Sequence, residues 1–292
     1  MIDAGHLLPL PRRGLWGFTG DFEAVLEGFE SLVRSSEPTR DVQVRSFPPL
    51  LAEEVFVATG YVRSFPQLIG SVNVFLGDGR GHQRLLKDQA AGLDWTTHLE
   101  PAHLNMLSAP CHATYPMHAG QILPQRVLYE LTSRCFRHEP SDDPARLMSF
   151  RMREKVCIGT PDDALEHRQL GLEVGPELLR SVGLTISVDP ANDPFFGRAA
   201  NLLKEGQRDA ELKFEFVCPM YGGDNPGVAL GSSNYHLDHF GLDFDIRTGD
   251  GQLAHSSCIG YGLERVTLAL FATHGTDVSQ WPSDVRQRLG LG

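Results

Sequence analysis

The stretch CFRHEPSDDPARLMSFRMREKVCIG, residues 135–159, decides the fold. A turn rich in Pro, Ser and Asp separates two runs of alternating residues, which predicts two strands joined by a loop. Because successive side chains of a strand point to opposite faces, we expect Arg137 and Glu139 on one face of the first strand. Phe150 and Glu154 share a face of the returning strand by the same rule. The residues alone also fit a surface hairpin with solvated charges.

A second motif, CIGYGLER at residues 258–265, precedes the apolar run VTLALFATHG. Its glycines would let backbone approach a nucleotide closely, and Arg265 falls in the first turn of a helix expected over 263–274. An ordinary helix start with two turn glycines fits the motif equally well. A dinucleotide-binding loop is disfavoured because no βαβ unit follows.

Together these stretches resemble motifs 2 and 3 of the class II aminoacyl-tRNA synthetases, in that family's order and spacing. The resemblance implies an α/β (α+β) fold, a mostly antiparallel sheet flanked by helices. We expect one catalytic domain over residues 1–292, with a helical insertion around residues 161–208. A helix over 21–35, capped by Asp21, and the strand after it resemble motif 1, which implies a homodimer. The same segments also fit an ordinary helix–strand pair.

The resemblance further implies an ATP site. Activation of a carboxylate builds negative charge on the α-phosphate, and the paired donors of a guanidinium suit such oxygens. Arg137 would hold the α-phosphate and the substrate carboxylate, and Glu139 would accept from the adenine amino group. Phe150 would stack on the purine, and Arg146 would reach the terminal phosphates. Arg265 would sandwich the adenine and contact the γ-phosphate.

A metal site is expected from Cys111, Glu154 and Cys258. Lone cysteines far apart in sequence are more often buried small hydrophobes. The atypical seryl-tRNA synthetases of methanogens carry Cys, Glu and Cys at these motif positions, and REKVCIG and SSCIGYGLERVTLALFATHG are similar to their wording. The resemblance therefore implies Zn²⁺, bound by two thiolates and a carboxylate, with an open position for the substrate amine.

The resemblance also places Ser233 and Asn234 in the amino-acid pocket. An amine held by zinc and a shallow Ser/Asn pocket indicate a small amino acid, glycine or alanine ahead of serine. Mg²⁺ is expected with ATP, although Val228 and Ala229 stand where the family has an acidic ligand. The glycine-rich segment 77–81 has no following Lys-Ser/Thr, so it indicates a turn or flexible loop and not a phosphate loop.

Charge and composition restrict the partners and the compartment. The formal net charge of −11 argues against tRNA, because phosphate contacts normally require a basic surface. No apolar run approaches the roughly 20 residues of a membrane span, and the N-terminus lacks the order of a signal peptide. Five cysteines are an odd number without a paired framework. We expect a cytoplasmic protein with free thiols and no membrane partner.

These features together resemble the amino acid:[carrier protein] ligases. The resemblance implies activation of a small amino acid as its adenylate and transfer to the phosphopantetheine thiol of a holo carrier protein. A helix expected over 195–208 offers Arg198, Lys204 and Arg208 as a docking face, although it also fits a solvated amphipathic helix. The alternatives are a tRNA-charging seryl-type synthetase, a ligase for a small-molecule acceptor, and a non-catalytic paralogue. Intact Arg137 and Glu139 argue against the last.

Overall fold

The predicted hairpin is confirmed. In this computed structural model, which describes all residues except 37–40, 194–195, 197–210, 223–224 and 226, two long antiparallel strands flank the loop. They are β8 (Val127–Phe136) and β9 (Ser149–Gly159). The second motif forms β14 (His255–Gly262), which runs directly into α8 (Leu263–His274), the helix with the predicted bounds.

These strands lie inside a seven-stranded sheet with the order β10-β11-β12-β14-β9-β8-β3. Neighbouring strands are antiparallel except β3 and β8, which are parallel. The mostly antiparallel sheet expected of the class II fold is therefore confirmed. Its other strands are β3 (Val42–Arg45), β10 (Ser187–Pro190), β11 (Lys213–Cys218) and β12 (Val228–Tyr235).

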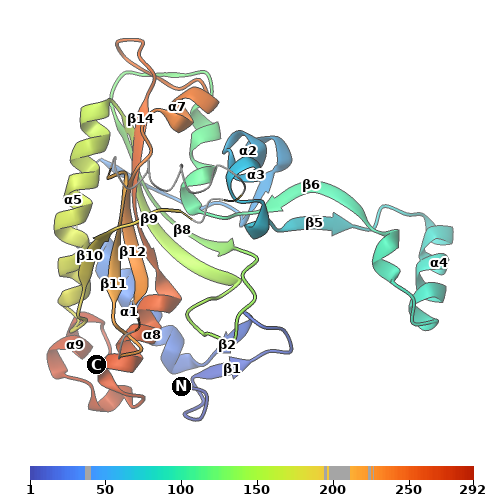
Figure 1. Cartoon of the computed structure of the whole chain (residues 1–292), viewed down its shortest axis with the longest axis horizontal. Coiled ribbons are helices and arrows are strands. Elements are labelled where there is room, and N and C mark those ends of the chain that lie inside the picture. Colours follow the sequence, from blue (N-terminus) through green and yellow to red (C-terminus); the bar gives the residue numbers. More distant parts are fainter. Residues whose placement is uncertain (37–40, 194–195, 197–210, 223–224, 226) are drawn as a thin grey trace.

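Helices α1 (Gly20–Ser35), α5 (Pro161–Arg180) and α8 share one hydrophobic core on one face of the sheet. The long helix α5 runs along the sheet in Figure 1. It packs closely because a Cβ added to Gly171 would lie only 2.5 Å from Ile259 Cγ1 of β14 and 2.7 Å from Ser233 Oγ of β12. Only glycine allows α5 to approach β14 so closely at this point.

The opposite face of the sheet holds the candidate site. Short helical segments cover it and pack, with their neighbours, on Val156 of β9 and Cys258 of β14. They are α2 (Glu53–Ala58), α3 (Tyr61–Ser64), the 3-10 turn η3 (Pro110–Ala113) and α7 (His239–Asp243).

An arm projects from this covered face to one side of the body (Figure 1). It consists of β5 (Ser71–Val74), α4 (Gly79–Ala90), the 3-10 turn η2 (Trp95–His98) and β6 (Glu100–Met106). Strand β6 pairs with β5 on one side and with β4 (Leu50–Ala52) on the other, which anchors the arm to the body.

The remaining elements are short. No helix in the described ranges combines the length and apolar content that a bilayer crossing requires. The short elements not yet named are β1 (Leu7–Pro9), β2 (Trp16–Phe18), β7 (Ile122–Leu123), β13 (Arg247–Thr248), η1 (Pro66–Leu68), η4 (Tyr115–His118), η5 (Val278–Gln280) and α9 (Ser283–Arg288).

Three sequence predictions about secondary structure need correction. The segment 77–81 is not a turn or loop throughout: α4 begins at Gly79, and the Asp78 side chain caps the helix by accepting from the Gly81 amide at 2.8 Å. Helix α1 is preceded by Thr19 at its N-cap, and Asp21 lies inside the first turn. The predicted insertion around residues 161–208 is only partly helical in its described residues, since α5 is followed by the edge strand β10.

Candidate active site

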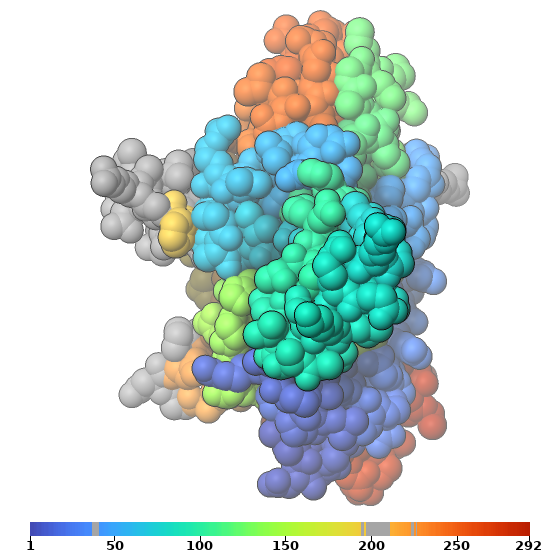
Figure 2. All heavy atoms as spheres, turned by 90° about the vertical axis from the view of Figure 1, so that its right-hand side faces the viewer, coloured from blue at the N-terminus to red at the C-terminus, as the bar shows by residue number. Residues whose placement is uncertain are grey.

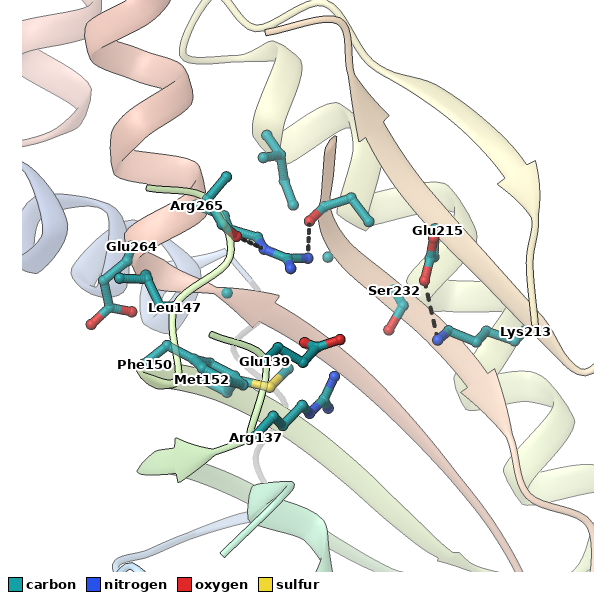
Figure 3. Close-up of a pocket in the computed structure, with 15 residues that line it drawn as sticks. Arg137, Glu139, Leu147, Phe150, Met152, Lys213, Glu215, Ser232, Glu264 and Arg265 are labelled. Carbon is teal, nitrogen blue, oxygen red and sulfur yellow. Dashed lines mark hydrogen bonds and ion pairs between the residues drawn. The ribbon is translucent and has the colours of Figure 1, made fainter. Parts of the chain in front are cut away.

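Arg137 and Arg265 come from separate segments and point into one pocket (Figure 3). We call it the arginine pocket. Glu139 and Phe150 line the same pocket, so four of the residues expected to bind ATP lie together there. Its other lining residues are Ala145, Leu147, Met152, Lys213, Glu215, Ala229, Leu230, Gly231, Ser232, Gly262 and Glu264.

Both guanidiniums are held in place before any ligand binds. The Arg137 guanidinium lies 5.5 Å from the centroid of the Phe150 ring, and it donates from Nε and Nη2 to Ser108 O at 3.4 Å. Arg265 donates from Nε to Ala145 O at 2.7 Å and from Nη1 to Ala229 O at 3.1 Å. Burial, followed by the nearby charge of Arg137, lowers the pKa of Arg265. Two cations facing one pocket favour an anionic ligand.

Arg146 differs from the other predicted ATP ligands. It is exposed on the loop after β8 and does not line the arginine pocket. Its charge still lies near enough to Arg265 to help lower the pKa of that residue, after burial and Arg137. Arg146 therefore stands at the rim, where it could meet the outer part of a bound anion.

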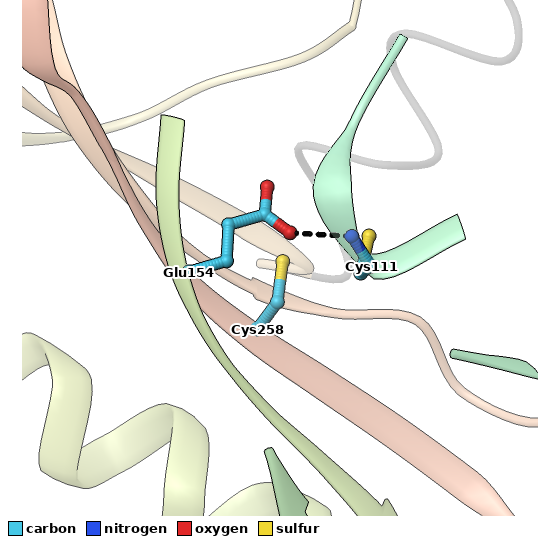
Figure 4. Close-up of side chains that lie close together, drawn as sticks. All are labelled: Cys111, Glu154 and Cys258. Atoms are coloured by element: carbon cyan, nitrogen blue, oxygen red, sulfur yellow. Dashed lines mark hydrogen bonds between the residues drawn. The ribbon is translucent and has the colours of Figure 1, made fainter. Parts of the chain in front are cut away.

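Cys111, Glu154 and Cys258 converge on a second pocket, the cysteine pocket (Figure 4). Their ligand atoms lie within 4.8 Å of one another, and all three residues are buried. The Glu154 carboxylate also accepts from the Cys111 amide at 2.8 Å, which orients it toward the two sulfurs. Three distant segments, η3, β9 and β14, are brought together here as the sequence predicts.

Electrostatics at this cluster are unfavourable without a cation. Burial and then the Cys258 thiolate raise the pKa of Glu154 to about 8. A hydrogen bond between the two thiols raises the pKa of Cys111 and lowers that of Cys258. A divalent cation would let all three groups ionise. Two sulfurs and one carboxylate are a donor set that suits zinc and leaves a coordination position open.

The two pockets adjoin. Arg137, Met152, Lys213 and Ser232 line both of them, and Arg137 stands at their junction. The cysteine pocket has a volume of about 520 Å³ and extends from the cluster to Tyr61 and Phe65 near α3. A molecule that spans the junction would present its anionic part to the arginines and its amine to the cysteine cluster.

Of the two residues predicted for the amino-acid pocket, Asn234 lines the cysteine pocket and Ser233 does not. Asn234 lines the cysteine pocket, and its Nδ2 lies 3.2 Å from Cys258 Sγ. Ser233 is fully buried on the opposite face, where its hydroxyl donates to Arg168 O of α5 at 2.9 Å. Because strand residues alternate between faces, Ser232 takes the place expected of Ser233.

His236 is a site residue that sequence reasoning missed. Its Nε2 lies 3.5 Å from Cys258 Sγ, and its Nδ1 lies 3.0 Å from Ser256 Oγ. Strand β12 ends at Tyr235, and both His236 and His239 beyond it line the cysteine pocket. A donor on a thiolate ligand orients the sulfur and tunes its basicity.

Replacing His236 with Ala is expected to weaken binding of a divalent metal about tenfold or more, because Cys258 loses an orienting donor. The matched control is His239→Ala, which changes another histidine of the same pocket that does not contact the cluster in the described residues. Competition with a chromophoric chelator measures the affinity, and the absorption of the cobalt-substituted protein reports the geometry. Equal affinity in the two variants would contradict this role.

Two carboxylates, Glu264 and Glu215, line the arginine pocket, whereas Val228 and Ala229 offer no acidic side chain. Glu264 is buried and accepts from the Arg151 side chain at 2.8 Å and from its amide at 2.7 Å. Glu215 of β11 forms an ion pair with Lys213 at 3.1 Å. Glu215 is therefore the better candidate to reach a magnesium ion carried by phosphates. The proposed docking residues Arg198, Lys204 and Arg208 lie outside the described residues.

Known proteins are similar to this chain over most of its length. The chain is 39% identical over 280 residues to amino acid–[acyl-carrier-protein] ligase 1 of Bradyrhizobium diazoefficiens, an alignment that covers 95% of this chain and 85% of the relative. The chain belongs to the amino acid–[acyl-carrier-protein] ligase family. Ligase 2 of the same organism is 38% identical over 281 residues, covering 95% and 83%. No family model matches the chain.

More distant relatives of this ligase are type-2 serine–tRNA ligases. That of Methanocaldococcus jannaschii is 22% identical over 307 residues, which cover 98% of this chain and 57% of the relative. Among solved structures, M. kandleri seryl-tRNA synthetase in complex with A. aeolicus tRNASec superimposes with a TM-score of 0.85 at 21% identity, covering 99% of this chain and 59% of that one. The Pyrococcus horikoshii enzyme complexed with ATP gives 0.70 at 14%, covering 95% and 57%. These structures show the class II fold.

Proposed function

We propose that this ligase activates a small amino acid with ATP and transfers it to the phosphopantetheine thiol of a holo carrier protein. Glycine or alanine is the expected substrate, ahead of serine. The observation that carries the proposal is the position of Arg137, at the junction between a pocket with two arginines and a pocket with a metal-ligand cluster. The two family relatives at 38–39% identity support the acceptor class.

Each side chain has a task in this scheme. ATP would lie in the arginine pocket, with Glu139 receiving the adenine amino group and Phe150 stacking on the purine. Arg137 and Arg265 would stabilise the charge that develops as the substrate carboxylate attacks the α-phosphate and pyrophosphate leaves. Arg146 would meet the terminal phosphates from the rim. Mg²⁺ would be held mainly by the phosphates, with Glu215 as its protein ligand.

Cys111, Glu154 and Cys258 would hold Zn²⁺. The ion would act as a Lewis acid, and its open coordination position would accept the amine of the substrate. The metal favours a free amine at a fixed place, so an N-blocked amino acid would be rejected. Asn234 and Ser232 form the polar wall beside it. The pocket of about 520 Å³ exceeds the space that a small amino acid needs, which leaves room for the thiol arm of the acceptor.

We also propose a homodimer. Strand β3 is one of the two edge strands of the large sheet in the described residues, and Val44 on it is 60% exposed. An edge strand presents unpaired backbone groups that a second copy can satisfy.

An amino-acid panel in ATP–pyrophosphate exchange tests the activation step, and glycine or alanine is expected to give the highest rate. Transfer of the labelled amino acid is then measured to holo carrier protein, to free pantetheine and to tRNA. The relationship to serine–tRNA ligases favours tRNA charging as the second candidate. Labelled tRNA without labelled carrier would reject the proposed acceptor. Exchange without transfer to any of the three would favour a small-molecule acceptor.

A further inference from the structure

The arm carries a helix that the rest of the described chain does not cover. Among the residues of α4, only Gly81 is buried. The helix packs on its own arm: Phe75 lies against His82, with ring centroids 6.3 Å apart, and Asp88 pairs with His98 of η2 at 2.7 Å. Figure 2 shows α4 and η2 at the front of the molecule, standing out from the body. A helix that packs only on its own arm in the described residues leaves a surface available to a partner.

One face of α4 is basic. Arg80, Arg84 and Lys87 are spaced four and three residues apart, so they follow one another along a single face of the helix. All three are exposed, and none forms an ion pair with another described residue. The chain as a whole has a formal charge of −11, so this concentration of unpaired cations contrasts with the average surface. Such a face attracts an acidic partner and repels a basic one.

The arm also exposes apolar side chains. Leu86 is 40% exposed, Leu93 after the helix is 60% exposed, and Trp95 of η2 is 43% exposed. Exposed tryptophan and leucine beside charged groups give a small protein interface its anchors, while the charges form the rim. A polyanion such as tRNA would use many more cations and few such anchors.

The arm is connected to the site by covalent and hydrogen-bonded paths. Strand β6 runs from the end of the arm to Met106, and Cys111 follows five residues later in the chain. At the root, Leu107 donates to Pro49 O at 3.0 Å, and its carbonyl accepts from Phe136 at 2.8 Å, one residue before Arg137. A partner held on α4 therefore has a fixed relation to both pockets.

We propose that α4, through Arg80, Arg84 and Lys87, with Trp95 of the adjoining η2, is the surface on which the carrier protein docks. The occupant is a small acidic protein that bears the thiol arm, and the inference rests on the proposed function. Docking on the arm would leave the long phosphopantetheine free to enter the cysteine pocket. Two other occupants are possible outcomes of the test: tRNA, and a second copy of this acidic chain.

The test compares Arg84→Glu/Lys87→Glu with the matched control Arg12→Glu/Arg288→Glu, which makes the same change in net charge at exposed positions away from the arm. Transfer of glycine or alanine is measured to two acceptors, a holo acyl carrier protein and free pantetheine, which needs no docking. The α4 variant is expected to raise KM for the carrier about tenfold and to flatten its dependence on salt. Pyrophosphate exchange and transfer to pantetheine stay unchanged, and so does the control.

Each other result overturns the inference. An unchanged KM in the α4 variant, or an equal rise in the control, would remove α4 as the docking surface. If Lys204→Glu/Arg208→Glu raises KM and the α4 variant does not, the carrier docks on residues 195–208. A shift from dimer to monomer in light scattering, with KM unchanged, would assign α4 to a second copy, and loss of tRNA charging would assign it to tRNA. If the unchanged chain transfers to neither carrier nor pantetheine, the proposed function itself fails.

Discussion

Replacing Arg137 with Ala is expected to reduce amino-acid-dependent pyrophosphate exchange about a thousandfold, because a preorganised donor at the reacting phosphate is lost. Arg137 stands where the arginine pocket meets the cysteine pocket, and Phe150 and Ser108 fix its guanidinium. Arg137→Lys is expected to lose nearly as much, since an ammonium cannot offer two parallel donors. The loss should fall mainly on kcat, because the interaction strengthens in the transition state.

Arg134→Ala is the matched control for Arg137. Arg134 lies on β8 three residues earlier and is exposed, so its loss should change the exchange rate less than about twofold. Thermal unfolding of all three variants checks that the fold survives. Full activity in Arg137→Lys would show that a positive charge suffices and would remove the paired-donor role. Full activity in Arg137→Ala would place the reaction elsewhere.

Replacing Cys258 with Ala is expected to remove the bound metal and to reduce exchange more than about a hundredfold, since two ligands cannot hold zinc as three do. The same result is expected from dialysis against a strong chelator, with recovery when zinc is returned. Cobalt substitution gives a readout that does not depend on activity, because the sulfur-to-metal charge-transfer absorption should weaken in Cys258→Ala. The expected loss follows from the convergence of Cys111, Glu154 and Cys258.

Cys218→Ala is the control for the metal site. Cys218 is as buried as Cys258, 4% exposed in each case, but it lies on β11 outside the cluster. Its replacement removes a buried sulfur without touching a ligand, so metal content and exchange should be unchanged. Metal-free protein, verified by elemental analysis, that still exchanges pyrophosphate at the full rate would eliminate the metal from activation.

The sequence predicted the parts of the site that depend on local motifs. The hairpin of β8 and β9 and the helix α8 follow from turn residues, alternation and an apolar run. The family resemblance then predicted that Arg137 and Arg265 meet in one pocket, as they do in the structure. Cys111, Glu154 and Cys258 could not be placed together by spacing alone. Their convergence depends on the antiparallel pairing of β14 with β9 and on the position of η3, which were expected from the family resemblance and not from the spacing of the residues.

The errors in the site have identifiable physical causes. Ser233 and Asn234 were both placed in the pocket, but neighbours on a strand face opposite ways, and only the register of β12 with β14 decides which one enters. The helix α4 was missed because two of its first three residues are glycines, which weaken helices, while the cap from Asp78 offsets that weakness. His236 was missed because its contact with Cys258 joins residues 22 positions apart.

The contact between Gly171 and β14 also limits how this active centre can be altered. Strand β14 presents Cys258, a candidate metal ligand, on its front, and the Ile259 side chain on its back lies against Gly171 of α5. A side chain larger than hydrogen at 171 would collide with the side chains of Ile259 and Ser233, next to residues that line the cysteine pocket. Enlarging the cavity for a bulkier amino acid is therefore better attempted from the α2–α3 side than from the side of β14 that packs on α5.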